Sequence, residues 1–276
     1  MSKVALIDGD LIAYACAASN QVDYDFTDGD EAPARAVDHD AAICKGLAMV
    51  DQWRALSQCS RTMVLFTGKN NFRKAVLPTY KAGRGEKPIA HQAVVEAIMR
   101  EHPSERIDGL EADDLLGILA TTLPKYRGAV VVSLDKDLAT VPGNHFNPAK
   151  DKKARVVTEA EANHAWMRQT LIGDSVDGYS GLYRCGPKNA DRILGRPGSS
   201  LDSLWHHVVT AYRGKGKTEE DAVVQARMAR ILRREDYNRE TKEIRLWHPT
   251  ETIWVSLTCA ENNQASALSG QTLSQP

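Results

Sequence analysis

Long hydrophobic runs are absent from this sequence: no apolar stretch approaches the roughly 20 residues that a membrane-spanning helix requires. The first residues lead directly into VALIDGD, without the basic and apolar regions of a signal peptide. Cysteine is also scarce, with five residues and no CxxC pair, which argues against a disulfide framework or a zinc ribbon. These absences predict a soluble protein of a reducing, cytoplasmic compartment, without a membrane partner.

An excess of either charge is also absent. Lys and Arg (35) nearly balance Asp and Glu (36), so the overall charge indicates no polyanionic partner. The charges are nevertheless segregated along the chain, because residues 8–40 are rich in acids and residues 69–88 are rich in bases. A metal site beside a phosphate-binding track would require such a segregation.

Strands and helices alternate in the first half of the chain. Three short apolar runs, at 4–7, 62–66 and 129–134, have the composition of buried parallel strands. The stretches 41–56 and 111–123 carry apolar residues at helical spacing. This order predicts an open α/β sheet, in which ligands bind beyond the carboxyl ends of the strands.

The character of the chain changes near residue 158, where β-branched runs become sparse. Thr158 and Glu161 form a capping box, which predicts a helix that ends near Gly173. Three further helices are expected at about 189–195, 200–212 and 218–238. We therefore expect an α/β domain, a helical region and a disordered polar tail over residues 1–157, 158–260 and 261–276, respectively.

Acids gather at the expected carboxyl edge of the sheet. They form four groups, which are Asp8 and Asp10; Glu111, Asp113 and Asp114; Asp135 and Asp137; and Asp174 and Asp177. Two like charges about 4 Å apart repel by roughly 4 kcal/mol at an effective dielectric constant near 20. Shared protons and Lys136 cannot balance so many carboxylates, whereas hard divalent cations such as Mg²⁺ or Mn²⁺ can. The pattern therefore predicts a metal site.

Other interpretations compete with metal binding. The acids at 111–114 lie in the first turn of a helix, where the helix dipole favours negative charge, and Asp135 and Asp137 could be solvated loop residues. A strand followed by Asp-x-Asp also opens the haloacid-dehalogenase-like phosphatases. Their pattern continues with Gly and Thr, where this chain has Leu11 and Ile12. The phosphatase is therefore the weaker enzymatic hypothesis.

Five segments, taken in order, resemble the flap endonuclease and 5′ to 3′ exonuclease family. They are IDGDLIAYACA, FRKAVLPTYKAGR, GLEADDLLGILA, VVVSLDKDLATV and TLIGDSVDGYSGLYRCGPKNADRIL. The pattern is of the phage type, similar to the N-terminal nuclease domain of bacterial DNA polymerase I. The resemblance implies an α/β, PIN-like 5′-nuclease fold, with a mostly parallel sheet flanked by helices, a helical arch near 73–105 and an appended helix-hairpin-helix region.

The resemblance also implies roles for individual residues. All nine acids match or adjoin its metal positions, with Asp10 at a variable one, and two ions are expected, with K⁺ at the hairpin. Tyr80, Lys81 and Arg84 match a segment at the base of the arch, where Tyr80 would stack a base and the two cations would stabilise charge on the phosphate. DNA contacts are expected from the basic and hairpin positions Arg73, Arg184, Gly186, Lys188 and Arg192.

Two departures from the family pattern stand out. Many members have an aspartate just after the second strand, where this chain reads Thr67-Gly68. The hairpin usually reads Gly-x-Gly, and Arg184 occupies the first position, which would be costly at a positive φ. The missing acid motivates one alternative, a DNA-binding relative that has lost catalysis.

The expected activity is metal-dependent hydrolysis of DNA from 5′ ends, exonucleolytic and able to cut flaps, giving 5′-phosphate products. The expected partners are DNA with 5′ ends, nicks or flaps, RNA–DNA hybrids and replication proteins. The expected location is the cytoplasm, which is that of the host cell if a phage encodes the chain.

Overall fold

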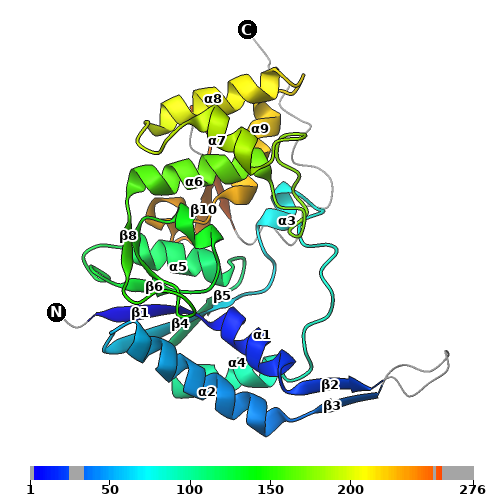
Figure 1. The fold of residues 1–276 in the computed structure, drawn as a ribbon, viewed down its shortest axis with the longest axis vertical. Coiled ribbons are helices and arrows are strands. Elements are labelled where there is room, and N and C mark those ends of the chain that lie inside the picture. Colours follow the sequence, from blue (N-terminus) through cyan, green and yellow to red (C-terminus); the bar gives the residue numbers. More distant parts are fainter. Residues whose placement is uncertain (1–2, 25–33, 251–252, 257–276) are drawn as a thin grey trace.

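The computed structural model describes residues 3–24, 34–250 and 253–256. Its centre is a six-stranded sheet with the strand order β5-β4-β1-β6-β7-β8 (Figure 1). In that order the strands span Ser104–Ile107, Arg61–Thr67, Val4–Asp8, Val130–Val132, Gly143–Phe146 and Arg155–Val157. All neighbours run parallel except β8, which pairs antiparallel with β7. The mostly parallel sheet expected from the sequence is confirmed, and the three predicted strands lie side by side as β4, β1 and β6.

Helices cover both faces of the sheet, which explains the unbroken apolar runs of its central strands. The helices that cover the two faces are α1 (Gly9–Ala18), α2 (His39–Leu56), α4 (His91–Glu101) and α5 (Ala112–Thr121). Ala5 and Ile7 of β1 belong to the core under α1, α2 and α4, whereas Leu6 belongs to the core under α5 (Figure 1). The parallel pairing of β4, β1 and β6 brings their carboxyl ends to the same edge of the sheet.

The segment expected to form a helical arch, near residues 73–105, is helical only at its two sides. It begins with a single turn, α3 (Arg73–Val76), and residues 77–90 then run as turns and irregular chain until α4. Pro78, Pro88 and the glycines at 83 and 85 disfavour helix in this stretch. Helix thus covers residues 73–76 and 91–101 of the range near 73–105, the stretch between them is not helical, and the last residues belong to β5. The arch itself stays a prediction.

The C-terminal part lies beyond α5, on the side away from α2 (Figure 1). Its helices are α6 (Glu159–Ile172), α7 (Pro187–Leu194), α8 (Leu201–Arg213) and α9 (Glu219–Ala229). The predicted helix over 218–238 is too long, because the chain leaves the helix at Ala229 and buries Arg230 and Arg233 in an extended stretch. A three-stranded antiparallel sheet follows, made of β9 (Tyr237–Asn238), β10 (Glu243–Leu246) and β11 (Ile253–Ser256).

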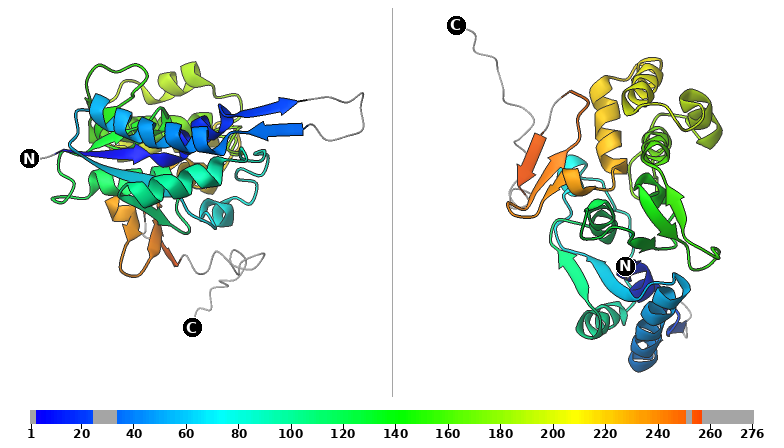
Figure 2. Two further views of the ribbon diagram at one scale, coloured as in Figure 1. Left: turned by 90° about the horizontal axis from the view of Figure 1, so that it is seen from below. Right: turned by 90° about the vertical axis from the view of Figure 1, so that its left-hand side faces the viewer.

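Two features lie at the periphery. The strands β2 (Gln21–Tyr24) and β3 (Ala34–Val37) pair antiparallel and project away from the main sheet (Figure 2). The predicted disordered tail at 261–276 falls outside the described residues. None of the described helices is long and apolar enough to span a membrane.

Candidate active site

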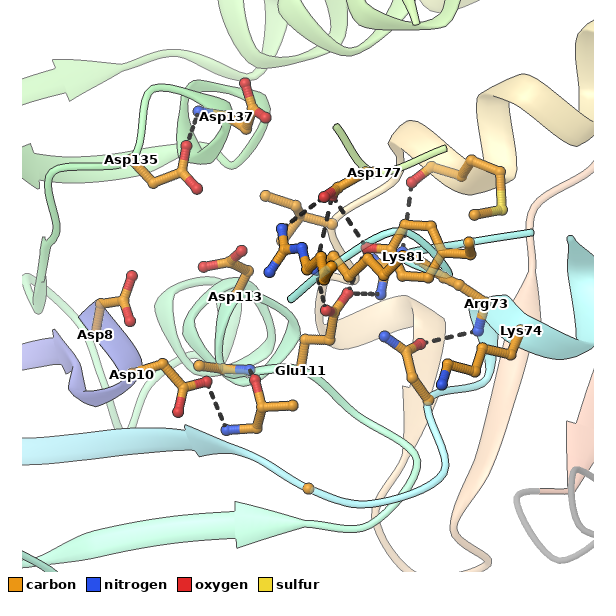
Figure 3. Close-up of a pocket in the computed structure, with 18 of the residues that line it drawn as sticks. Asp8, Asp10, Arg73, Lys74, Lys81, Glu111, Asp113, Asp135, Asp137 and Asp177 are labelled. Carbon is orange, nitrogen blue, oxygen red and sulfur yellow. Dashed lines mark hydrogen bonds and ion pairs between the residues drawn. The ribbon is translucent and has the colours of Figure 1, made fainter. Parts of the chain in front are cut away.

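A cavity of about 450 Å³ opens at the carboxyl edge of the sheet, where β1, β4 and β6 end. Seven of the nine predicted metal-binding acids line it, namely Asp8, Asp10, Glu111, Asp113, Asp135, Asp137 and Asp177. The predicted catalytic residues Tyr80, Lys81 and Arg84 line it as well. Figure 3 shows Asp8, Asp113 and Asp135 directed toward a common space between the strand ends. The fold therefore brings most of the predicted site together.

Asp8 is held at the end of β1 by two hydrogen bonds. Its Oδ1 accepts from the N–H of Leu11 (3.2 Å), which caps α1, and its Oδ2 accepts from the Ser133 hydroxyl (2.9 Å). The same hydroxyl oxygen accepts from the N–H of Asp135 (3.0 Å). Ser133 thus links two acids of the site, although sequence reasoning missed it. The only signal was its place directly after β6, two residues before Asp135.

The acids on the β1 side of the cavity disfavour one another's ionisation. Burial, together with the charge of Asp10, raises the pKa of Asp8 to about 7. Burial, followed by the charges of Asp8 and Asp135, raises the pKa of Asp113 well above its ordinary value. These carboxylates lack countercharge, which is the condition that a bound cation relieves.

A second group of acids lies on the far side of Asp135. Burial, followed by the charge of Asp135, raises the pKa of Asp137 to about 6, and the charges of Asp174 and Asp177 act in the same direction. Asp174 does not line the cavity; its Oδ1 accepts from the N–H groups of Val176 (2.8 Å) and Asp177 (3.2 Å) and so fixes that turn. Asp135 is therefore shared between two groups of carboxylates.

The chemistry of these side chains fits hard divalent cations, which take oxygen ligands. Among the described residues, no three His, Cys, Asp or Glu side chains converge closely enough, as they are placed, to hold one ion. Mg²⁺ usually keeps several of its waters and takes only one or two carboxylates directly, so its binding does not require three side chains to converge. A bound cation would also relieve the repulsion between the carboxylates.

The basic residues that line the cavity lie around one acid, Glu111. Lys81 donates to Glu111 Oε1 and its Nζ lies 3.6 Å from Asp177 Oδ2, while the Tyr80 hydroxyl donates to Glu111 Oε2 (2.8 Å). Burial opposes ionisation of Glu111, but the charges of Arg73 and Lys81 outweigh it and hold its pKa at about 2. Glu111 is therefore an ionised anchor for these donors.

The chain holds Lys81 in an unfavourable backbone conformation. Its φ is +55°, which costs a residue other than glycine about 1–2 kcal/mol. The N–H of Lys81 donates to the carbonyl of Asp177 (2.9 Å), and Arg84 Nη2 donates to Asp177 Oδ1 (2.6 Å). The loop at 174–178 thus fixes both predicted catalytic cations at the cavity.

Three predicted roles are contradicted by burial. Arg73, expected to contact DNA, is 3% exposed, and all five of its N–H donors are used inside the protein. Asp114, expected to bind metal, is fully buried; its two oxygens accept from Arg73 at 2.7 Å and from the N–H groups of Glu111 and Leu232. Tyr80 is 3% exposed, so its ring cannot stack on a base. Arg73 and Tyr80 therefore border the cavity with their polar groups already used inside the protein, and Asp114 lies behind its lining.

Local contacts account for the residues Thr67 and Gly68, which stand where many family members have an aspartate. The Thr67 hydroxyl accepts from the N–H of Ala112 (3.0 Å) at the start of α5. A side chain at position 68 would meet the carbonyl oxygen of Ile107 at 2.0 Å, so glycine is required there. Asp10 Oδ2 instead accepts from the N–H of Thr67 (3.1 Å), which brings a carboxylate from α1 to the end of β4.

The predicted hairpin lies between α6 and α7. Arg184 has a φ of +55°, so the site does require the left-handed conformation, and its guanidinium lies over the Tyr183 ring at 5.1 Å. Gly186 precedes α7 as its N-cap, and Pro187 is its first residue. The side chains of Arg184, Lys188 and Arg192 are exposed, as is Gly186, and their contact with DNA stays a prediction.

Residues 3–167 match the family described as 5′-3′ exonuclease, N-terminal resolvase-like domain. The chain belongs to the 5′–3′ exonuclease family. The exonuclease of Escherichia phage T7 is 29% identical to this family member, over 89% of this chain and 93% of the phage protein. The flap endonuclease Xni of Shewanella pealeana is 30% identical, over 58% of this chain and 67% of that protein.

Among solved structures, the T5 5′-exonuclease with bound zinc ions has a TM-score of 0.56 at 16% identity, over 82% of this chain and 89% of that one. This likeness confirms the predicted fold. The family membership confirms the resemblance inferred from the five segments. It also argues against the phosphatase hypothesis. The chain is therefore a nuclease, a hydrolase of phosphodiester bonds.

Proposed function

We propose that this 5′–3′ exonuclease family member hydrolyses DNA from 5′ ends with two divalent cations, Mg²⁺ or Mn²⁺. The observation that carries the proposal is the cavity at the carboxyl edge of the sheet, where seven carboxylates line one space. The raised pKa values of Asp8, Asp113 and Asp137 support a cation, because each is explained by burial and by neighbouring acids. The zinc ions described for the T5 5′-exonuclease also support a metal cofactor.

Two groups of carboxylates support two ions rather than one. Asp8, Asp10 and Asp113 would hold the first, Asp137 and Asp177 the second, and Asp135 lies where it can serve both. When bound, such ions lower the pKa of a water molecule and stabilise the departing 3′ oxygen.

Lys81 and Arg84 would orient and neutralise the scissile phosphate. Both now donate to carboxylates of the site, Lys81 to Glu111 and Arg84 to Asp177. A phosphate that enters the cavity offers these donors a second set of anionic oxygens. Tyr80 would act indirectly, because its buried hydroxyl orients Glu111 and Asp177.

The proposed substrate is DNA with a 5′ end, a nick or a flap, cut to leave a 5′ phosphate and a 3′ hydroxyl. The names of the matched relatives, exonuclease and flap endonuclease, support this class. RNA–DNA hybrids, replication proteins, K⁺ at the hairpin and a cytoplasmic location are also proposed. The exposed residues Arg184, before α7, and Lys188 and Arg192, on α7, would contact phosphates of the duplex.

The decisive test is the Asp135→Asn variant, assayed on 5′-labelled single-stranded, blunt, nicked and flapped DNA with Mg²⁺ or EDTA. We expect the wild type to cut only with Mg²⁺ and the variant to lose at least about a hundredfold in rate, because Asp135 serves both carboxylate groups. Binding of the same DNA, measured by fluorescence anisotropy in EDTA, should survive.

The matched control is Asp202→Asn, which removes an exposed carboxylate from the first turn of α8, far along the chain from the cavity. Its cleavage rate should stay near that of the wild type. Full activity of Asp135→Asn would refute the site assignment. Metal-independent binding without any cleavage by the wild type would instead favour the inactive DNA-binding relative.

A further inference from the structure

A second cavity, of about 210 Å³, lies beside the candidate active site. Its lining residues come from β6 and the loop after it, from the end of β7, and from the segment that leads to the first residue of β8. Because β7 runs parallel to β6, and β8 runs antiparallel to β7, the end of β7 and the start of β8 lie at the carboxyl edge that carries the catalytic acids. Asp135 lines both cavities, so they are direct neighbours. We call this second space the β7–β8 cavity.

Three cations line the β7–β8 cavity, namely Lys136, Lys150 and Arg155. All three are exposed, and no ion pair joins any of them to a carboxylate in the part of the chain that the structure describes. The lining also contains the acids Asp135 and Asp151. Three cations against two acids leave a net positive charge beside a strongly acidic site.

The loop that carries Lys150 is held by its own hydrogen bonds. The N–H of Asn147 donates to Asp151 Oδ2 (2.8 Å), and the Asn147 carbonyl accepts from the N–H groups of Lys150 and Asp151. The Asn147 side chain donates to the carbonyl of Leu134 (3.5 Å), which joins this loop to the loop after β6. One oxygen of Asp151 is thus committed to the loop backbone. The cations are therefore presented from a fixed frame.

We infer that the β7–β8 cavity binds a backbone phosphate of the substrate strand, next to the phosphate that is cut. This inference rests on the proposed function, because it takes the acidic cavity as the cleavage site. Every nucleotide carries a phosphate, so a strand whose scissile phosphate lies at Asp135 brings the neighbouring phosphates to the flanking surface. Lysine and arginine donors match phosphate oxygens, and such contacts position DNA without reading its sequence.

The test uses the double variant Lys150→Ala/Arg155→Ala, which removes two cations of the cavity. The matched control is Lys152→Ala/Lys153→Ala, because these two exposed lysines lie on the same loop but do not line the cavity. Binding of a duplex is measured by anisotropy in EDTA at several salt concentrations, so the result does not depend on cleavage. Lys136 is left intact because it lies between Asp135 and Asp137.

We expect the cavity variant to bind DNA at least tenfold more weakly, with the slope of log K against log salt reduced by about 1, as the loss of one phosphate contact predicts. The control should change affinity less than threefold. Equal losses in both variants, or no loss in the cavity variant, would overturn the inference. The Asp135→Asn assay tests the proposed nuclease function separately, so the two ideas can fail independently.

A second arm separates a backbone phosphate from a terminal one. The cavity variant is compared on duplexes with a 5′ phosphate and with a 5′ hydroxyl. Equal losses on both duplexes support a backbone phosphate. A loss confined to the 5′-phosphorylated duplex would overturn that assignment in favour of a terminal phosphate site.

Discussion

Replacing Arg73 by methionine should be among the most damaging single changes in this nuclease. The guanidinium donates to both oxygens of Asp114 at 2.7 Å, to Glu111 (3.0 Å) and to the carbonyl oxygens of Met228 and Arg230. Methionine has a similar length but no charge and no donors, so the Asp114 carboxyl would be left fully buried without its partner. Removing one member of a buried ion pair typically costs about 3–5 kcal/mol.

That cost is large against the total stability of a folded protein, which is about 5–15 kcal/mol. Unfolding in urea, followed by circular dichroism in EDTA, measures the loss of free energy of unfolding. Lys74→Met is the matched control, because Lys74 is the next residue of α3 and is exposed; its effect should stay within about 0.5 kcal/mol.

A double-mutant cycle with Asp114→Asn identifies the cause. In that background no buried carboxylate charge is left at position 114, so Arg73→Met should cost about 1–3 kcal/mol less than it does in the wild type. A loss below about 1 kcal/mol for Arg73→Met, or the same loss in both backgrounds, would refute the view that Arg73 joins α3, α5 and the end of α9 through a buried ion pair.

Two further predictions concern the acids of the site. Asp10→Asn should slow Mg²⁺-dependent cleavage by about tenfold or more, and Thr67→Asp should restore part of the rate in that variant, because Asp10 already reaches the end of β4 where Thr67 stands; no rescue would contradict the compensation. In EDTA, stability should fall as the pH rises from about 4 to about 7. The reason is that Asp8 and Asp137 have folded pKa values of about 7 and about 6, above their ordinary value, so the folded state binds more protons than the unfolded state in that window. Urea titrations should show a flatter profile for Asp8→Asn; a wild-type protein that is more stable near pH 8 than near pH 5 would contradict this explanation.

The parts that sequence reasoning predicted well depend on local patterns. The β-branched run at 129–134 favours a strand buried on both faces, and an acid that follows such a strand emerges at its carboxyl end. The capping box at Thr158 begins α6 as predicted, because its two hydrogen bonds join residues only three positions apart.

The parts that were missed depend on distant partners. Arg73 has the same charge as its exposed neighbour Lys74, and Asp114 has the same charge as Asp113, which lines the cavity. Their pairing with each other and with the backbone at 228–232 makes Arg73 and Asp114 interior residues. The short strands β5, β7 and β8 have three or four residues each, too few to show a period. Residues 230–238 leave the helical pattern because Arg230 pairs with Asp236 and packs on the Trp166 ring.

The sequence by itself therefore determined the central strands and the grouping of acids beyond their ends. Tertiary structure alone decided which charged residues face the cavity and which are buried behind it, because a charge is buried only where another segment supplies its countercharge and hydrogen bonds. It also decided that Asp135 is shared by two cavities, one acidic and one basic, since that depends on the side-by-side order of β6, β7 and β8.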